Sequence, residues 1–210
     1  MLDGQMRKLI DPPLNRIGVW LASKHVSANG VTLTGFAIGL LAALAIALQF
    51  YLAGLVLLLL SRVADGLDGA VARASAPSDL GGFLDITLDF FFYGAIPLAF
   101  AIADPEANAL AAAVLLAGFY ATGSSFLAFA VMAERRHITT TAQGIKSLYY
   151  IAGLAEGTET IAVFVAFCLF PDWFSWIAYG FAAICFVTAV NRVVIGWITL
   201  KPGAGSDPDN

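Results

Sequence analysis

Charged residues are scarce in this chain. Only 12% of its 210 residues are Asp, Glu, Lys or Arg, whereas 60% are hydrophobic and the mean hydropathy is +0.82. A soluble domain of this size needs a larger share of charged side chains to cover its surface. The composition therefore excludes an ordinary soluble globular protein and predicts an integral membrane protein.

Cysteine and histidine are also rare. Cys168 and Cys185 lie in separate apolar segments, and His25 and His137 stand alone, so neither residue type shows the spacing of a metal site. We expect both cysteines to be core residues. The N-terminal 30 residues also lack the apolar run and small-residue cleavage site of a signal peptide, so we expect the first span to direct insertion.

Apolar segments long enough to cross a bilayer, which takes about 20 residues per helix, fill most of the chain. Six spans are expected, at 31–50, 52–74, 80–103, 107–133, 147–170 and 173–199. Before them, the stretch after Pro12 and Pro13 mixes basic and apolar residues at helical spacing. It predicts an amphipathic helix on the membrane surface, with a solvated arm as the alternative. The predicted fold is all-α and has three parts: an N-terminal cytoplasmic segment with the surface helix (1–30), a six-helix transmembrane catalytic domain (31–200) and a disordered tail (201–210).

Basic residues at the ends of the expected spans share one side of the membrane if the N-terminus is cytoplasmic. They are Arg73, Arg135, Arg136, Lys146, Arg192 and Lys201. The opposite turns hold only the acids Asp104, Glu106 and Asp172. Because Lys and Arg are enriched on the cytoplasmic side, we expect a cytoplasmic N-terminus, in a bacterial inner membrane.

Residues 62–90, "RVADGLDGAVARASAPSDLGGFLDITLDF", hold five aspartates among mostly apolar residues. Asp65 and Asp68 are three residues apart, so they lie on one face of a helix. Asp85 and Asp89, four apart, do the same on the next helix. A carboxylate within a membrane helix costs about 2.5 to 3.5 kcal/mol, and such residues usually mark a functional site. The four are therefore expected to converge.

Four converging carboxylates repel one another unless positive charge enters the site. Only Arg62 and Arg73 lie nearby in the sequence, and oxygen ligands suit hard ions. The pattern predicts a site for two divalent ions, Mg²⁺ or Mn²⁺. The fifth aspartate, Asp79, follows Pro77 and Ser78 and is interpreted as part of a helix N-terminus.

The order and spacing of eight residues resemble the signature of the CDP-alcohol phosphotransferase (CDP-alcohol phosphatidyltransferase) family. These residues are Asp65, Asp68, Gly69, Ala72, Arg73, Gly81, Asp85 and Asp89. The gap between Arg73 and Gly81 is seven residues rather than the common eight, which indicates a divergent subgroup. Upstream, "ANGVTLTG" is similar to an Asn, two residues, Thr element of the family. The resemblance covers roughly residues 7 to 200.

The resemblance implies a membrane enzyme of phospholipid biosynthesis with its active site on the cytoplasmic side. It would transfer a phosphatidyl group from a CDP-linked lipid, such as CDP-diacylglycerol, to the hydroxyl of a small alcohol and release CMP. The implied metal ligands are Asp65, Asp68, Asp85 and Asp89, with Asp89 also the general base. The implied nucleotide- and diphosphate-binding residues are Asn29, Thr32, Asp68, Gly69, Ala72 and Arg73. The expected partners are the donor lipid, the acceptor alcohol, the bilayer and a second copy in a homodimer, but no nucleic acid.

The acceptor site has weaker sequence support. Lys146, in "GIKSLYY", together with Arg135 and Arg136 could bind a phosphate of the acceptor, or could only follow the positive-inside rule. Glu156 and Glu159 could receive a hydroxyl or amine, or could pair with a basic residue for structure. The acceptor therefore stays open among glycerol 3-phosphate, inositol phosphate, serine, choline and ethanolamine.

A secondary transporter or ion pathway is the alternative class, because acids within a membrane also mark cation routes. Such transporters carry comparable broken helices in both halves of the chain. Here the acids are concentrated in the second and third expected spans. An enzyme is therefore preferred, and CMP production would discriminate between the two.

Overall fold

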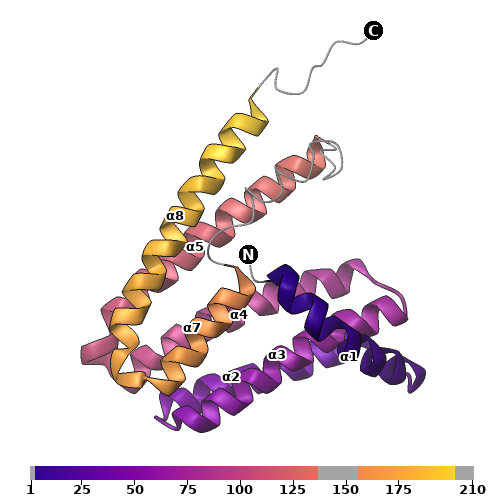
Figure 1. Cartoon of the computed structure of the whole chain (residues 1–210), viewed down its shortest axis with the longest axis horizontal. Coiled ribbons are helices and arrows are strands. Elements are labelled where there is room, and N and C mark those ends of the chain that lie inside the picture. The colour runs from indigo at the N-terminus through magenta and orange to yellow at the C-terminus, as the bar shows by residue number, and fades with distance from the viewer. Residues whose placement is uncertain (1–2, 137–155, 202–210) are drawn as a thin grey trace.

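A computed structural model of the chain describes residues 3–136 and 156–201 (Figure 1). Every regular element in these two ranges is helical. The α-helices are α1 (Asp3–Ser23), α2 (Ala28–Ala47), α3 (Tyr51–Ala74), α4 (Asp79–Ala103), α5 (Pro105–Arg135), α7 (Gly157–Leu169) and α8 (Phe174–Leu200). A 3-10 turn, η1 (Pro171–Trp173), leads into α8.

Within the described ranges, four helices are long and apolar enough to cross a membrane, namely α2, α4, α5 and the η1–α8 segment, and α7 is a shorter apolar helix. The prediction of an all-helical integral membrane protein is confirmed at this level. Helix α3 has the length of a span at 24 residues, but it carries two arginines and two aspartates. The start of the fifth expected span falls outside the described residues.

The N-terminal helix is longer than predicted. It begins at Asp3 and includes both Pro12 and Pro13, whereas the sequence predicted only the half after the prolines. Proline lacks a backbone N–H, so the prolines interrupt the hydrogen-bond ladder there without ending the helix. Helix α1 packs along α3, where a Cβ at Gly18 would lie 2.6 Å from Ala70 Cβ.

Serine caps begin the two helices that flank the aspartate-rich stretch. Ser27 Oγ accepts a hydrogen bond from Gly30 N at 3.1 Å, and Ser78 Oγ accepts one from Gly81 N at 3.1 Å. Each bond satisfies a backbone N–H that has no partner within the first turn of the helix. Asp79 lies in the first turn of α4, as the helix-start interpretation predicted.

Helix α2 packs against both α3 and α4 and holds them in place. A Cβ at Gly39 would lie 2.7 Å from Phe92 Cδ2 on α4 and 2.9 Å from Ser61 Oγ on α3, so the close approach requires glycine. Ser61 Oγ also donates to Gly35 O at 2.8 Å. The polar stretches of α3 and α4 thereby face each other beside α2.

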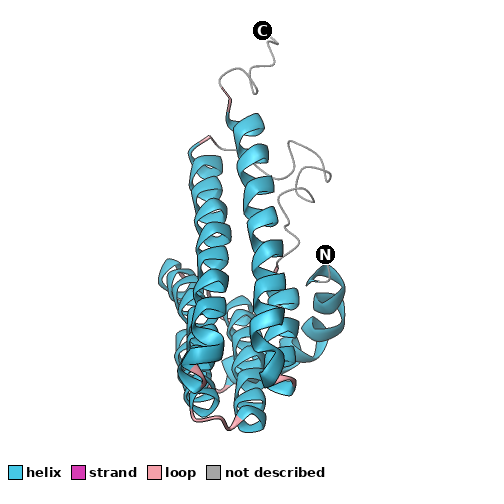
Figure 2. Ribbon diagram, turned by 90° about the vertical axis from the view of Figure 1, so that its left-hand side faces the viewer, coloured by secondary structure: helices cyan, strands magenta, loops and turns pink. Residues whose placement is uncertain are grey.

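The remaining helices enclose an aromatic core. Helices α5 and α8 pack side by side (Figure 1), and Figure 2 shows the bundle from the side. Buried rings from α4, α7 and α8 meet in this core; Phe100 and Phe174 stack with ring centroids 4.7 Å apart. Cys168 and Cys185 are buried free thiols, which confirms their interpretation as core residues.

Candidate active site

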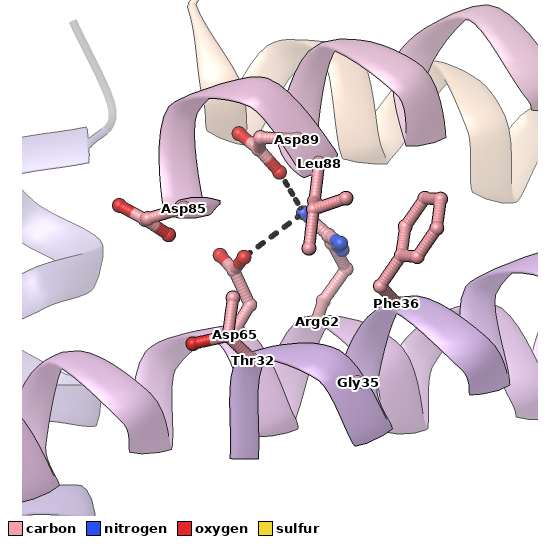
Figure 3. A pocket seen from close by; sticks show the side chains of 8 residues that line it. All are labelled: Thr32, Gly35, Phe36, Arg62, Asp65, Asp85, Leu88 and Asp89. Atoms are coloured by element: carbon pink, nitrogen blue, oxygen red, sulfur yellow. Dashed lines mark hydrogen bonds and ion pairs between the residues drawn. The ribbon is translucent and has the colours of Figure 1, made fainter. Parts of the chain in front are cut away.

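Three carboxylates converge between α3 and α4. One oxygen from each of Asp65, Asp68 and Asp85 lies within 4.8 Å of the others. Helix α3 supplies the first two from one face and α4 supplies the third; Figure 3 shows Asp65 and Asp85 facing each other. We call these three side chains the carboxylate cluster. Oxygen atoms gathered in this way can bind a hard divalent cation.

Asp68 is the most buried member of the carboxylate cluster, with 5% of its surface exposed. Its Oδ2 atom has no hydrogen-bond partner among the residues that the structure describes. A buried carboxylate oxygen is costly unless a donor or a cation satisfies it. The cluster therefore fits a divalent ion of the class that the sequence predicts, Mg²⁺ or Mn²⁺.

Asp89, the fourth expected ligand, is joined to the cluster through an arginine. Arg62 Nη1 lies 2.5 Å from Asp89 Oδ1 and 3.6 Å from Asp65 Oδ1. Figure 3 shows the guanidinium between these two carboxylates. The structure thus gathers three of the four aspartates directly. It places the positive charge of Arg62 between Asp65 on α3 and the fourth aspartate, Asp89, on α4.

The Arg62 side chain is held on several sides. Its Cζ lies 3.8 Å from the centroid of the fully buried Phe92 ring, and Nη2 donates to Ser61 Oγ at 3.3 Å. Only 14% of the side chain is exposed. A desolvated cation stacked on an aromatic ring is stabilised by about 2 kcal/mol. The guanidinium therefore has a defined position.

A groove of about 570 Å³ opens beside the carboxylate cluster, within the usual size range of small-molecule sites. Asp68 and Asp85 form part of its wall. The wall also includes four more residues predicted to bind the nucleotide: Asn29, Thr32, Gly69 and Ala72. Gly81, a further residue of the signature, lines the groove as well, and a Cβ there would lie 3.1 Å from Asn29 Oδ1. Glycine therefore lets the start of α4 approach α2.

Arg73 lies at the end of α3, close to this groove. A Cβ on Gly69 would lie 3.3 Å from Arg73 Nη1, so the guanidinium stands over that glycine. Arg73 Nη2 donates to Asn15 Oδ1 of α1 at 3.0 Å. The N-terminal helix therefore helps to position the arginine that was predicted to pair with a phosphate.

The predicted acceptor residues are only partly described. Arg135 ends α5 and Arg136 caps it, and both are exposed. Glu156 precedes the first residue of α7 and is half-buried. Lys146 lies outside the described residues. The assignment of these four side chains to an acceptor site stays a prediction.

Two residues beside the site were given no role by sequence reasoning. Arg62 is three residues before Asp65, so helical spacing places both side chains on the same face of the helix. A basic residue within an apolar span also indicates a functional site, so the sequence did contain a signal for Arg62. Asn15 gave no such signal, because its contact with Arg73 depends on how α1 packs on α3.

Comparisons with known proteins agree with this geometry. The family model for CDP-alcohol phosphatidyltransferase matches residues 25–195. The Escherichia coli inner membrane protein YnjF is 51% identical over 201 residues, covering 96% of this chain and 98% of its own length. An archaetidylinositol phosphate synthase of Methanothermobacter thermautotrophicus is 30% identical over 202 residues, covering 93% of this chain and 92% of its own length.

Solved structures share the fold. The phosphatidylinositol phosphate synthase of Mycobacterium tuberculosis with CDP-DAG bound has a TM-score of 0.71 at 20% identity, covering 94% of this chain and 98% of the solved one. The same enzyme in complex with manganese and citrate has a TM-score of 0.70 at 21% identity, covering 93% of each chain. The signature residues, the extent of the family match and the fold agree, and the chain is an enzyme of the CDP-alcohol phosphatidyltransferase family.

Proposed function

We propose that this enzyme transfers the phosphatidyl group of CDP-diacylglycerol to the hydroxyl of a small alcohol, with release of CMP, in phospholipid biosynthesis. The observation that carries the proposal is the carboxylate cluster beside a groove of nucleotide size. The Mycobacterium tuberculosis synthase that shares the fold binds CDP-DAG, which supports this donor. Family membership removes the reason to retain a transporter as the alternative.

The carboxylate cluster would hold the divalent metal. Asp65, Asp68 and Asp85 offer one oxygen each, and Asp68 also has the buried oxygen described above. The bound ion would supply charge that stabilises the diphosphate and makes CMP a better leaving group. The choice of Mg²⁺ or Mn²⁺ is supported by the oxygen-only donor set and by the manganese complex of the similar structure.

The groove would bind the cytidine diphosphate portion of the donor. Gly69 and Ala72 present little side chain, so the nucleotide can lie against α3, and Asn29 and Thr32 offer polar groups from α2. Arg73, held by α1, would pair with a phosphate oxygen. These residues bind and orient the donor with its diphosphate directed to the carboxylate cluster.

Asp89 would act as the general base. The acceptor hydroxyl gives its proton to the Asp89 carboxylate while its oxygen attacks the phosphorus that carries the diacylglycerol. The bond from that phosphorus to the bridging oxygen breaks, and CMP leaves with the electron pair. Direct attack is favoured because the nearby hydroxyls serve structure: Ser61 and Ser75 donate to backbone carbonyls, and Ser78 caps α4.

We propose a phosphorylated polyol, inositol phosphate, as the acceptor. The named archaeal and mycobacterial relatives make inositol phosphate lipids, which supports this class. Arg135, Arg136 and Lys146 would contact the phosphate of the acceptor, and Glu156 would receive one of its hydroxyls. Guanidinium groups suit phosphate because they donate two parallel hydrogen bonds.

The proposed arrangement in the membrane has six spans, formed by α2, α3, α4, α5, α8 and the segment that ends in α7. Helix α1 would lie on the cytoplasmic surface, where the exposed Val19 and Trp20 meet the bilayer. The N-terminus and the active site would face the cytoplasm of a bacterium, as a homodimer in the inner membrane. The inner-membrane location of the Escherichia coli relative supports the compartment.

The test is CMP release by the purified chain in detergent with CDP-diacylglycerol and Mg²⁺ or Mn²⁺. Inositol phosphate, glycerol 3-phosphate, inositol, serine, choline and ethanolamine are each supplied as acceptor. We expect inositol phosphate to give the fastest CMP release together with a matching phospholipid product. Faster turnover with an unphosphorylated acceptor would overturn the acceptor assignment, and no CMP with any acceptor would overturn the proposed reaction.

A further inference from the structure

The turn between α1 and α2 places an imidazole on the wall of the groove. His25 lies in this turn and lines the groove of about 570 Å³ beside the carboxylate cluster. Two backbone hydrogen bonds hold the turn: His25 N donates to Ala22 O at 3.0 Å, and Val26 N donates to Leu21 O at 3.2 Å. The sequence pattern gave His25 no role, because no other histidine or cysteine lies near it.

The backbone at His25 has a conformation that glycine usually supplies. Its φ is 59°, in the left-handed region, where glycine is the common residue just past a helix end. The other positive-φ residue besides glycine in the described ranges is Gln49, at 65°. The Gln49 side chain has a structural contact, because its Nε2 donates to Ala103 O at 2.8 Å. Glycine would suit the turn at His25 equally well, so the backbone does not account for the imidazole.

Most polar side chains on the groove already have partners. Asp68 and Asp85 belong to the carboxylate cluster. Four hydroxyl groups bond to nearby backbone atoms, those of Ser27, Thr32, Ser75 and Ser78. Within the described part of the chain, the imidazole of His25 and the amide of Asn29 form no hydrogen bond. Both groups can donate and accept, and Asn29 is already expected to bind the nucleotide.

The two ends of the groove determine how the donor would lie in it. Asp68 is seven residues before Ser75 along α3, and Asp85 is seven after Ser78 along α4. At 1.5 Å per residue, the groove extends about 10 Å from the carboxylate cluster to the turns. The residues of these turns are exposed, whereas acyl chains must stay in the hydrocarbon of the bilayer. With the diphosphate at the cluster, the nucleoside would point toward the turns.

We propose that His25 binds the nucleoside of the cytidine-linked donor by a hydrogen bond from the imidazole. This inference rests on the proposed function, since it adds a residue to the same donor site. A neutral imidazole has one donor and one acceptor, which suit the hydroxyls and ring atoms of cytidine. His25 contributes to donor affinity from the end of the groove opposite the carboxylate cluster, so it does not contact the diphosphate.

Calorimetric titration of the full chain in detergent tests the inference without turnover. The probes are CDP and pyrophosphate, each with Mn²⁺ and without an acceptor. His25→Gly removes the imidazole and suits the positive φ, and His25→Gln keeps a donor and an acceptor. Gln49→Gly is the matched control, because it makes the same exchange at the other positive-φ position, beyond the far end of α2. Thermal unfolding of each variant verifies that it is folded.

His25→Gly should weaken CDP binding by about 3- to 10-fold, the effect of one hydrogen bond, and should leave pyrophosphate binding unchanged. His25→Gln should bind CDP more tightly than His25→Gly, and Gln49→Gly should match the wild type. Unchanged CDP affinity in His25→Gly, or an equal loss of pyrophosphate affinity, would overturn the inference and leave the proposed reaction standing. No CDP binding by the wild type would overturn the proposed donor, and this inference with it.

Discussion

Replacing Asp68 by asparagine is expected to stabilise the protein when metal is removed and to abolish its stabilisation by metal. Asp68 is buried beside two other carboxylates, and its Oδ2 has no hydrogen-bond partner among the described residues. Asparagine removes the charge and adds two N–H groups, which can donate hydrogen bonds to the neighbouring carboxylate oxygens. The same change removes a ligand from the carboxylate cluster.

The size of the stabilisation expected for Asp68→Asn without metal follows from the distance between the carboxylate charges. Two unit charges 4.8 Å apart repel by about 3.5 kcal/mol at an effective dielectric constant of about 20. The charge of Asp65 is partly offset by Arg62, so only the pair of Asp68 with Asp85 is counted. Because Asp85 is exposed, solvent screens part of this repulsion, which leaves about 1 to 3 kcal/mol. For a chain of this length that is a rise of roughly 3 to 10 °C in the midpoint of thermal unfolding.

Thermal unfolding of purified protein in detergent, followed by tryptophan fluorescence with chelator or with Mn²⁺, measures both effects. Asp79→Asn is the matched control, because Asp79 is exposed in the first turn of α4. The control should unfold at a slightly lower temperature in chelator, since a favourable charge near the helix N-terminus is lost, and should keep the Mn²⁺ response. A lower midpoint for Asp68→Asn in chelator, or an undiminished Mn²⁺ response, would refute the reasoning.

Three further substitutions test separate parts of the site. Asp89→Asn should reduce CMP release by about 10²- to 10⁴-fold, measured with saturating donor, while CDP-diacylglycerol binding persists; an unaltered rate would remove Asp89 as the base. Phe92→Leu should lower the free energy of unfolding by about 2 kcal/mol through the lost stacking on Arg62, and a double-mutant cycle with Arg62→Met should show this coupling rather than additivity. Gly39→Ala should destabilise by about 1 to 3 kcal/mol, because its Cβ would meet Phe92. The control Gly94→Ala, with nothing within 4 Å of the new Cβ, should be neutral or slightly stabilising in the same unfolding assay.

The helix pattern was largely predictable because residues that cap or break helices bound the apolar runs. Ser78 and Asp104 cap the helices that begin at Asp79 and Pro105, close to two of the predicted boundaries. The extent of α1 was not predictable in the same way, because two adjacent prolines normally mark a helix end. Whether a helix continues across prolines depends on the packing of both its halves, and the sequence pattern does not contain that packing.

The carboxylate cluster was predictable for a similar reason. Spacings of three and four residues fix the face of a helix on which Asp65, Asp68 and Asp85 lie, whatever the rest of the fold does. The partner of Asp89 was not predictable, because it depends on which side chain of the neighbouring helix reaches that carboxylate. Arg62 reaches it from α3, where α2 packs closely against both α3 and α4 at Gly39.

The dependence of CMP release on Mn²⁺, measured in the wild type and in Asp85→Asn, connects the carboxylate cluster to the reaction. With CDP-diacylglycerol and inositol phosphate present, the chelated wild type should release no CMP and should recover as Mn²⁺ is added back. Asp85→Asn should stay inactive at Mn²⁺ concentrations that saturate the wild type, while its thermal unfolding remains cooperative. CMP release by the chelated wild type, or a normal rate in Asp85→Asn, would contradict a metal-dependent transferase site built on these three aspartates.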